Sequence, residues 1–433
     1  MHKPLLATLL CIFSVQLFAQ DLVDIYRLAK QNDLTLKISQ ADYDAARESL
    51  PIAISTRRPQ VNLSLQQSLK KNDNSSTNNK TNQNWGYTLS LTQTIYNTQT
   101  SAQVESAKFS VRQAAANLEV AEQDLVIRVA SRYFAILSAQ DSVKLVRAEQ
   151  NAIARQLEQA QKKFEVGLIA ITDVHEAQAL YDSSLTQSLL VENQLDNAFQ
   201  ALQVITAQPL SSTIAELGSQ LSLIIPQPAD IQAWIDTSLK NNQRLVAALA
   251  ESNAAKYELQ RQSRGHYPTV DFSVSYNDSR INDNLLGKYD QDYINLMVQL
   301  KVPLFTSGRI DANRQKAAAA YLSTQNNALL QNRLTSQQTR IAYLGVVSSI
   351  SLVKSFKQAL NSSTIALKAT EAGFEVGTRT SVDVLVSLRD TFRAQRDYSS
   401  ARYDYLINTL KLKRIAGLLS PDDLTAINRW LIL

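Results

Sequence analysis

A tract of 80 residues, between Gly86 and Gly167, contains neither glycine nor proline. Because these two residue types are the strongest helix breakers, the tract predicts one long helix from about Thr98 to Phe164. At 1.5 Å per residue, its roughly 67 residues would extend about 100 Å. A helix that long needs a partner along its whole length, so we expect coiled-coil packing rather than an amphipathic helix on a compact bundle.

The chain repeats this arrangement 210 residues further on. Gly167 marks a turn into a second helical tract, and the equivalent turn at Gly377 joins a tract that begins near Gly308 to one that runs from Ser381 to Ile415. We therefore predict an internal duplication after a signal peptide at 1–19, with repeats at 20–225 and 226–433. Each repeat would hold a short helix, two strands and a long helix hairpin, with hairpin tips near residues 167 and 377.

Two stretches of alternating apolar and polar residues precede the long helix in each half. The apolar positions are Val61, Leu63 and Leu65; Tyr87, Leu89 and Leu91; Val270, Phe272 and Val274; and Leu296, Val298 and Leu300. Strands of about 9 to 11 residues with one apolar face are typical of outer-membrane barrels, and a soluble β-sandwich is the alternative. The hydrophilic stretches Lys70–Trp85 and Asn277–Asp292 are predicted as the hairpin loops.

Four strands cannot close a membrane barrel, because an open strand edge is not tolerated in lipid. The chain is therefore expected to oligomerise. Two copies would supply eight strands around a filled lumen, and three would supply twelve with room for a water-filled pore.

Composition and the first residues narrow the class of protein. Lys3, the apolar run Leu5–Phe18 and Ala19 predict a secretory signal peptide, and the single cysteine, Cys11, falls inside it. The net charge of +5 is dispersed, so nucleic acid is not an expected partner. With three histidines and no cluster of acid, base or nucleophile, we predict no enzyme, no catalytic or metal site and no cofactor.

Three stretches resemble the TolC family of outer-membrane efflux proteins, also called outer membrane factors. They are Phe164–Val174 (FEVGLIAITDV), Glu371–Leu385 (EAGFEVGTRTSVDVL) and Ala401–Asn408 (ARYDYLIN). The resemblance covers essentially the whole mature chain. It implies a homotrimer in which four strands per protomer form one 12-stranded barrel in the cell outer membrane, continued by a long α-helical coiled-coil barrel in the periplasm.

The same resemblance implies the function. The trimer would be the exit duct of tripartite drug efflux, type I protein secretion or both, with a periplasmic gate that opens on engagement of its partners. Those partners would be a periplasmic adaptor (membrane fusion) protein and an inner-membrane efflux pump or ABC transporter. The alternative is a non-porous periplasmic coiled-coil structural protein, which would explain the helices but not the strands.

The resemblance also assigns roles at the hairpin tips. Adaptor contact is implied for Val166, Gly167 and Leu168 and for Val376, Gly377 and Thr378. Links that hold the gate shut between neighbouring coiled coils are implied for Gln156, Thr172, Asp173, Glu371 and Arg379. A local account covers the glycines, since any helix hairpin needs one, but leaves the repeated Phe-Glu-Val unexplained. The family has a tyrosine at the position of Phe374, so one gate link is expected to be absent or replaced.

A pore constriction is implied at Asp383, an aspartate that would form a ring around the trimer axis. The family's second aspartate corresponds to Val386, so the ring here is single. Asp390 lies seven residues beyond Asp383 on the same helix face, and two interpretations stay open. It is either a displaced second ring or a solvated surface acid.

Overall fold

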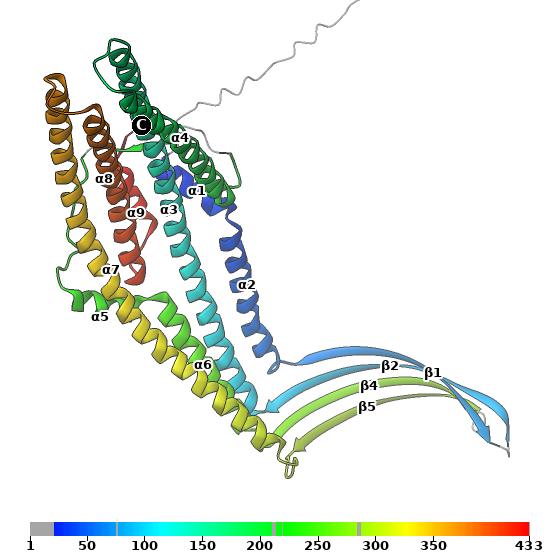
Figure 1. Ribbon diagram of the computed structural model, residues 1–433. Helices are drawn as coiled ribbons and strands as arrows, with labels where there is room; N and C mark the ends of the chain where they lie inside the picture. Colours follow the sequence, from blue (N-terminus) through cyan, green and yellow to red (C-terminus); the bar gives the residue numbers. More distant parts are fainter. Residues whose placement is uncertain (1–20, 75–76, 210–213, 219, 284–286, 433) are drawn as a thin grey trace, which may run out of the picture. The chain divides into compact units, whose positions relative to one another are not determined.

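The computed structural model describes residues 21–74, 77–209, 214–218, 220–283 and 287–432 (Figure 1). The predicted signal peptide lies outside these residues. The chain divides into two compact units. The first comprises residues up to 37, 121–240 and 337–433, and the second comprises 38–120 and 241–336.

The elements of the first repeat are α1 (Leu22–Asn32), α2 (Leu34–Ser55), β1 (Gln60–Asn74), β2 (Thr77–Tyr96), α3 (Thr98–Glu165), α4 (Ile171–Thr206) and β3 (Glu216–Leu217). Those of the second are α5 (Ile231–Asn241), α6 (Gln243–Ser263), β4 (Thr269–Asp283), β5 (Gly287–Lys301), α7 (Arg309–Glu375), α8 (Ser381–Ile415), α9 (Pro421–Asn428) and β6 (Leu431–Ile432). The order of long helices and paired strands is the same in both repeats. The boundaries 20–225 and 226–433 stay predictions.

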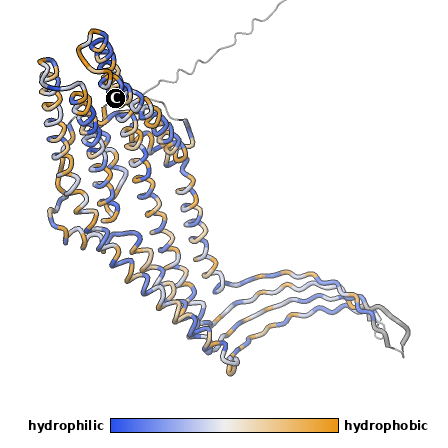
Figure 2. Tube along the Cα trace, viewed as in Figure 1, coloured by the Kyte–Doolittle hydropathy of each residue, from blue (hydrophilic) through white to orange (hydrophobic). Residues whose placement is uncertain are grey.

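The predicted long helices are confirmed. Helix α3 has 68 residues and α7 has 67, and α8 runs between the two residues predicted for it. Figure 2 shows hydrophobic and hydrophilic residues interspersed along each long helix. Within the part of the chain that the structure describes, none of the helices contains an apolar stretch that could span a lipid bilayer.

Each repeat also begins with two helices separated by one capping residue. Asp33 lies between α1 and α2 and accepts a hydrogen bond from the Leu36 N–H at 2.7 Å. Asn242 lies between α5 and α6 and accepts one from the Leu245 N–H at 3.1 Å. Asp33 is buried and also receives two hydrogen bonds of 2.8 Å from the Arg128 guanidinium, which fixes the junction to α3.

The second unit contains a four-stranded antiparallel sheet in the order β1-β2-β4-β5. Leu91 of β2 lies opposite Val61 on one side and Val274 on the other, and Val274 lies opposite Leu296. Residues opposite one another share a face, so these positions form apolar rows across all four strands. Within one chain the apolar side chains of the edge strands are exposed to solvent, and Val61 is 62% and Val298 67% exposed. The predicted alternation is confirmed.

The other face of the sheet is polar and bonded to itself. The Thr88 hydroxyl donates to the Asn277 amide oxygen at 2.8 Å, and the Thr94 hydroxyl donates to Asp271 at the same distance. Thr88 and Thr94 of β2 on this face therefore have partners on β4.

The predicted hairpin loops are wrong in extent. Strand β1 continues to Asn74 and β2 begins at Thr77, while β4 continues to Asp283 and β5 begins at Gly287. Antiparallel pairing needs only backbone donors and acceptors, so it continues past the residues that alternate in hydrophobicity. The alternation marks the apolar band of the sheet and not the length of its strands.

The first unit is packed around aromatic side chains. Tyr133 and Phe134 are fully buried, and the Phe134 and Tyr403 rings stack with centroids 5.7 Å apart. The Tyr133 hydroxyl donates to the Ala215 carbonyl at 2.6 Å, and that of Tyr403 donates to Asp141 at 2.8 Å. This core supports the two helix hairpins whose tips hold the candidate site.

Candidate functional site

The two hairpin tips have the same backbone turn. At the first, the Gly167 N–H donates to the Phe164 carbonyl and the Leu168 N–H donates to the Lys163 carbonyl, both at 2.8 Å. This pair of bonds is a Schellman motif, which requires a residue with positive φ, and Gly167 has φ 76°. At the second tip, the N–H groups of residues 377 and 378 repeat these bonds, and Gly377 has φ 79°.

Both turns present apolar side chains to solvent in the single chain. Val166 is 68% exposed and Val376 is 75% exposed, and Leu168 and Thr378 are exposed beside them. The six residues predicted to contact an adaptor therefore lie at the two tips. Their role in that contact stays a prediction.

The two hairpins pack against each other behind their tips. A cluster of Ile153 and Leu157 from α3, Ala177 from α4, and Leu385 and Leu388 from α8 is buried between them. The Lys163 ammonium also lies 3.8 Å above the centre of the Phe374 ring. Phe374, which lacks the family's hydroxyl, thus contacts a cation of the other hairpin.

The predicted gate residues are not linked to one another within one chain. Thr172, Glu371 and Arg379 are exposed and Asp173 is half-buried. Among the described residues, no ion pair within 4 Å involves Asp173 or Arg379. The side-chain oxygen of Gln156 is buried and has no hydrogen-bond partner in the described chain. The predicted links would have to be made with a neighbouring copy.

Gly373 is a residue that sequence reasoning did not single out. A Cβ atom at this position would lie 2.8 Å from the Arg379 Cγ, and the Arg379 N–H donates to the Gly373 carbonyl at 3.2 Å. The absence of a side chain on Gly373 therefore lets Arg379 lie against the end of α7. The only sequence signal was its place four residues before the turn glycine.

Asp383 has a local structural role that the sequence analysis did not assign. Its carboxylate accepts hydrogen bonds from the Thr380 N–H at 2.9 Å and hydroxyl at 3.0 Å, and the Thr380 hydroxyl accepts one from the Asp383 N–H at 3.1 Å. These bonds form a capping box at the start of α8. The Thr380 N–H also holds the pKa of Asp383 below its usual range. The spacing Thr-x-x-Asp was the available signal.

The other constriction candidates lie further along α8. Val386 is 41% exposed, and Asp390 is exposed with its carboxylate 3.8 Å from the Arg389 guanidinium. A pair that long and that exposed contributes little stability. Among the described residues, no three His, Cys, Asp or Glu side chains gather in a geometry that could hold a metal ion.

The sequence profile of the family described as "Outer membrane efflux protein" matches residues 25–208 and 234–418. The Outer membrane protein TolC of Vibrio cholerae is 34% identical over 421 residues, covering 96% of this chain and 95% of that protein. The Alkaline protease secretion protein AprF of Pseudomonas aeruginosa is 25% identical over 420 residues, covering 95% and 87%.

Solved structures show the same fold at lower identity. The Campylobacter jejuni CmeC outer membrane channel matches with a TM-score of 0.80 at 14% identity, over 95% of this chain and 90% of that chain. The outer membrane protein VceC of Vibrio cholerae matches with a TM-score of 0.78 at 18% identity, over 92% and 96%. The profile covers most of both repeats, strands and hairpins alike, and leaves no support for a non-porous coiled-coil protein. The chain belongs to the outer membrane efflux protein family, and it is a non-enzymatic transport protein of the outer membrane with a periplasmic helical part.

Proposed function

We propose that this chain forms a homotrimer in which three four-stranded sheets close into one 12-stranded barrel. The observation that carries the proposal is the sheet itself. It has one apolar face that is exposed in the single chain, and its edge strands β1 and β5 have no further neighbour in the described chain. In lipid each edge needs another strand, and three copies are the smallest number that leaves an aqueous pore.

The proposed trimer is the exit duct of tripartite drug efflux or type I protein secretion. Its partners are a periplasmic adaptor protein, which contacts the exposed tips at Val166 and Val376, and an inner-membrane efflux pump or ABC transporter. The gate is closed by links between neighbouring protomers, in which Arg379 meets Thr172 and Asp173. A guanidinium–carboxylate pair suits this role because it is directional and reversible. Asp383 lines the constriction of the closed duct.

The test of this architecture measures mass and conductance together. The purified full chain in detergent should have three times the protomer mass by native mass spectrometry, and it should form discrete ion-conducting channels in a planar bilayer. A stable monomer or dimer, or a trimer with no conductance under any applied voltage, would reject the proposed duct.

The lipid-facing side of the sheet can be tested separately. Leu91→Lys and Val298→Lys place a charge on the apolar face and should each reduce stability by about 2–4 kcal/mol near the bilayer midplane. Ser90→Lys and Gln299→Lys are matched controls, since each changes the residue next in sequence, which points to the polar face. Greater loss in the controls than in the first pair would mean that the polar face meets the lipid.

A further inference from the structure

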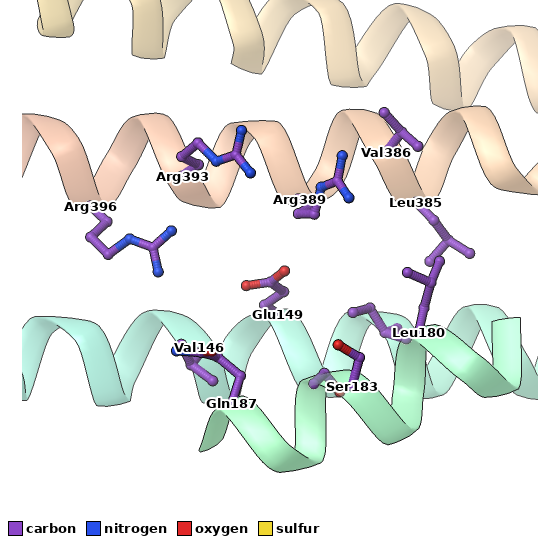
Figure 3. A pocket seen from close by; sticks show the side chains of 12 residues that line it. Val146, Glu149, Leu180, Ser183, Gln187, Leu385, Val386, Arg389, Arg393 and Arg396 are labelled. Carbon is purple, nitrogen blue, oxygen red and sulfur yellow. The ribbon is translucent and has the colours of Figure 1, made fainter. Parts of the chain in front are cut away.

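A groove in the first unit carries three arginines that the proposed gate and barrel do not use. It lies between α3, α4 and α8 and has a volume of ≈ 260 Å³. Arg389, Arg393 and Arg396 line it from α8, at a spacing of four and three residues that puts them on one helix face. Glu149 of α3 points toward them from the opposite wall (Figure 3).

The charges in this groove do not balance. Glu149 is the only acid among the lining residues. Arg393 and Arg396 make no hydrogen bond or ion pair within the described chain, and Arg389 is 3.8 Å from Asp390 of its own helix. Among the lining residues three guanidinium groups therefore face one carboxylate, that of Glu149, which has no ion pair within 4 Å among the residues described. The lining side chains have an excess of two positive charges when Glu149 is ionised, and Asp390, outside the groove, lies beside one of the three arginines.

The surroundings strengthen the effect of these charges. The buried side chains of Val146, Ile153, Ser184 and Leu385 form part of the wall. Electrostatic interactions are stronger beside such a wall than in bulk water. Burial raises the pKa of Glu149, while Arg396, Arg389 and Arg393 oppose the rise, in that order of strength. Glu149 is thus an imperfect counter-charge for the arginines.

We propose that this groove is a binding site for a small organic anion with two or more carboxylates, held by Arg389, Arg393 and Arg396. A guanidinium binds a carboxylate through two parallel hydrogen bonds, and separate arginines can take separate carboxylates of one molecule. The volume is just below the ~300 Å³ at which small-molecule sites begin, so the anion has few carbon atoms. Ser183 and Gln187 line the same groove and supply groups for a hydroxyl of the ligand.

Glu149 sets the affinity of this site. Its carboxylate repels the incoming anion and competes with it for the guanidinium groups. Replacing it with the neutral glutamine removes one negative charge from the groove and leaves the arginines in place. Anion binding should therefore become tighter in Glu149→Gln, which is the opposite of what loss of a structural ion pair would produce.

The test is calorimetric titration of citrate into the purified full chain in detergent at low ionic strength. The wild type should bind citrate, and Arg393→Gln/Arg396→Gln should bind it at least ~10-fold more weakly, because each lost pair is a hydrogen bond between charged groups. Glu149→Gln should bind it ~3-fold or more tightly. Arg155→Gln is the matched control, since it removes an exposed positive charge of α3 that does not line the groove.

Three outcomes would overturn the proposal: no citrate binding by the wild type, equal binding by the wild type and the double glutamine variant, or an equal loss in Arg155→Gln. If the double glutamine variant does not fold, Arg393→Lys/Arg396→Lys keeps both charges and removes the planar donors. It should then bind citrate several-fold more weakly than the wild type, and unchanged binding would reject the arginine site. The titration needs no conducting pore, so its result is separate from that of the bilayer experiment.

Discussion

Asp33 and Asn242 occupy the same place in the two repeats, between the two helices that open each one. Each accepts a hydrogen bond from the N–H three residues ahead, that of Leu36 or Leu245. Asp33 carries a charge and is buried, and it receives two further bonds from the Arg128 guanidinium at 2.8 Å. Asn242 caps its helix as a neutral amide. Both repeats therefore keep a capping side chain at this junction, although one is charged and the other is neutral. The charged one, Asp33, is buried together with a partner, Arg128.

The two hairpin tips likewise share a backbone turn and differ in the side chains that follow it. Asp173 and Asp383 are each the third residue of the helix after the tip. Thr380 engages the carboxylate of Asp383 in a capping box, whereas Ala170 has no side chain that could engage Asp173. Within the described chain the Asp173 carboxylate accepts no hydrogen bond. The first tip therefore leaves its carboxylate available to a neighbouring copy, which is what the proposed gate link to Arg379 needs.

The largest effect is expected from making the two junctions alike. Asp33→Asn keeps the cap on Leu36 and removes the charge that Arg128 binds, so it should lower the free energy of unfolding by about 3 kcal/mol at pH 7. The measurement is the chemical-denaturation midpoint of the purified protein. Asp33→Asn/Arg128→Met should recover part of the loss, because no unpaired guanidinium remains. Full stability in Asp33→Asn alone would show that the pair contributes nothing.

The same pair predicts a pH dependence. Burial alone would raise the pKa of Asp33. The hydrogen bonds from Arg128, those from the backbone N–H groups of Leu36 and Thr35, and the charge of Arg128 together outweigh burial and hold the pKa below its usual range. A carboxyl whose pKa is lowered in the folded state stabilises the protein at pH values above its unfolded-state pKa of ~3.9. This contribution is lost as the pH falls through the folded pKa. Asp33→Asn should therefore show a smaller loss of stability on acidification than the wild type.

The second prediction tests whether the free carboxylate of the first tip is used. Arg379→Ser removes the guanidinium proposed to meet Thr172 and Asp173 of a neighbouring copy. A hydrogen bond between charged groups is worth about 2 kcal/mol, so the closed-to-open ratio should fall ~10-fold or more. Single-channel recording should show a larger resting conductance. If Asp173→Asn raises the conductance and Arg379→Ser does not, the carboxylate has a different partner.

These tips also show how far sequence reasoning could go. Helix ends, turn glycines and the face of each strand follow from local rules, and the helix from Ser381 to Ile415 was predicted to the residue. The Lys163–Phe374 contact and the groove of Arg389 and Glu149 were not predicted. They join residues 211 and 240 positions apart, whose distance depends on how the hairpins pack and not on any local pattern.

For the strands, the sequence predicts which face is apolar but not where each strand ends. The alternation of Val61, Leu63 and Leu65 predicted the apolar face, and the register across the sheet confirms it. It did not predict where the strands end, because the polar residues beyond Leu69 pair through their backbones without any hydrophobic signal. Capping of α8 by Asp383 follows from a local pattern, its spacing of three residues from Thr380, whereas a place in the pore is implied only by the resemblance to the family.

The third prediction tests whether the two turns are equivalent. Gly167 and Gly377 have φ of 76° and 79°, and an added Cβ would meet nothing within 4 Å at either position. Gly167→Ala and Gly377→Ala should therefore each cost about 1 kcal/mol, from the backbone conformation alone. Thermal unfolding should show equal shifts for the two variants. A loss several times larger in one of them would mean that this turn is packed against something in the assembled protein.

The fourth prediction makes the first tip resemble the second. Ala170→Thr places a capping residue three positions before Asp173, as Thr380 lies before Asp383. The new capping box should stabilise α4 by about 1 kcal/mol, and Thr380→Ala should destabilise α8 by a similar amount. Ala170→Thr should also raise the resting conductance, because Asp173 becomes engaged locally. Tighter folding with an unchanged gate would show that Asp173 is not part of the link.

The last and smallest effect concerns the phenylalanines of the two tips. Phe374 lies under the Lys163 ammonium at 3.8 Å, whereas its counterpart Phe164 is exposed and has no cation above its ring in the described chain. Phe374→Tyr keeps the aromatic face for Lys163 and adds a hydroxyl donor at the gate. The closed state should be stabilised by less than about 1 kcal/mol, since the new hydrogen bond must offset the entropy lost when its partner becomes ordered.

Resting conductance in a planar bilayer should fall slightly in Phe374→Tyr. Phe164→Tyr, the same change at the first tip, is the control and should leave the conductance unaltered. If Phe164→Tyr lowers the conductance and Phe374→Tyr does not, a hydroxyl at the first tip closes the gate and one at the second tip does not. The gate link would then lie at Phe164 and not at Phe374.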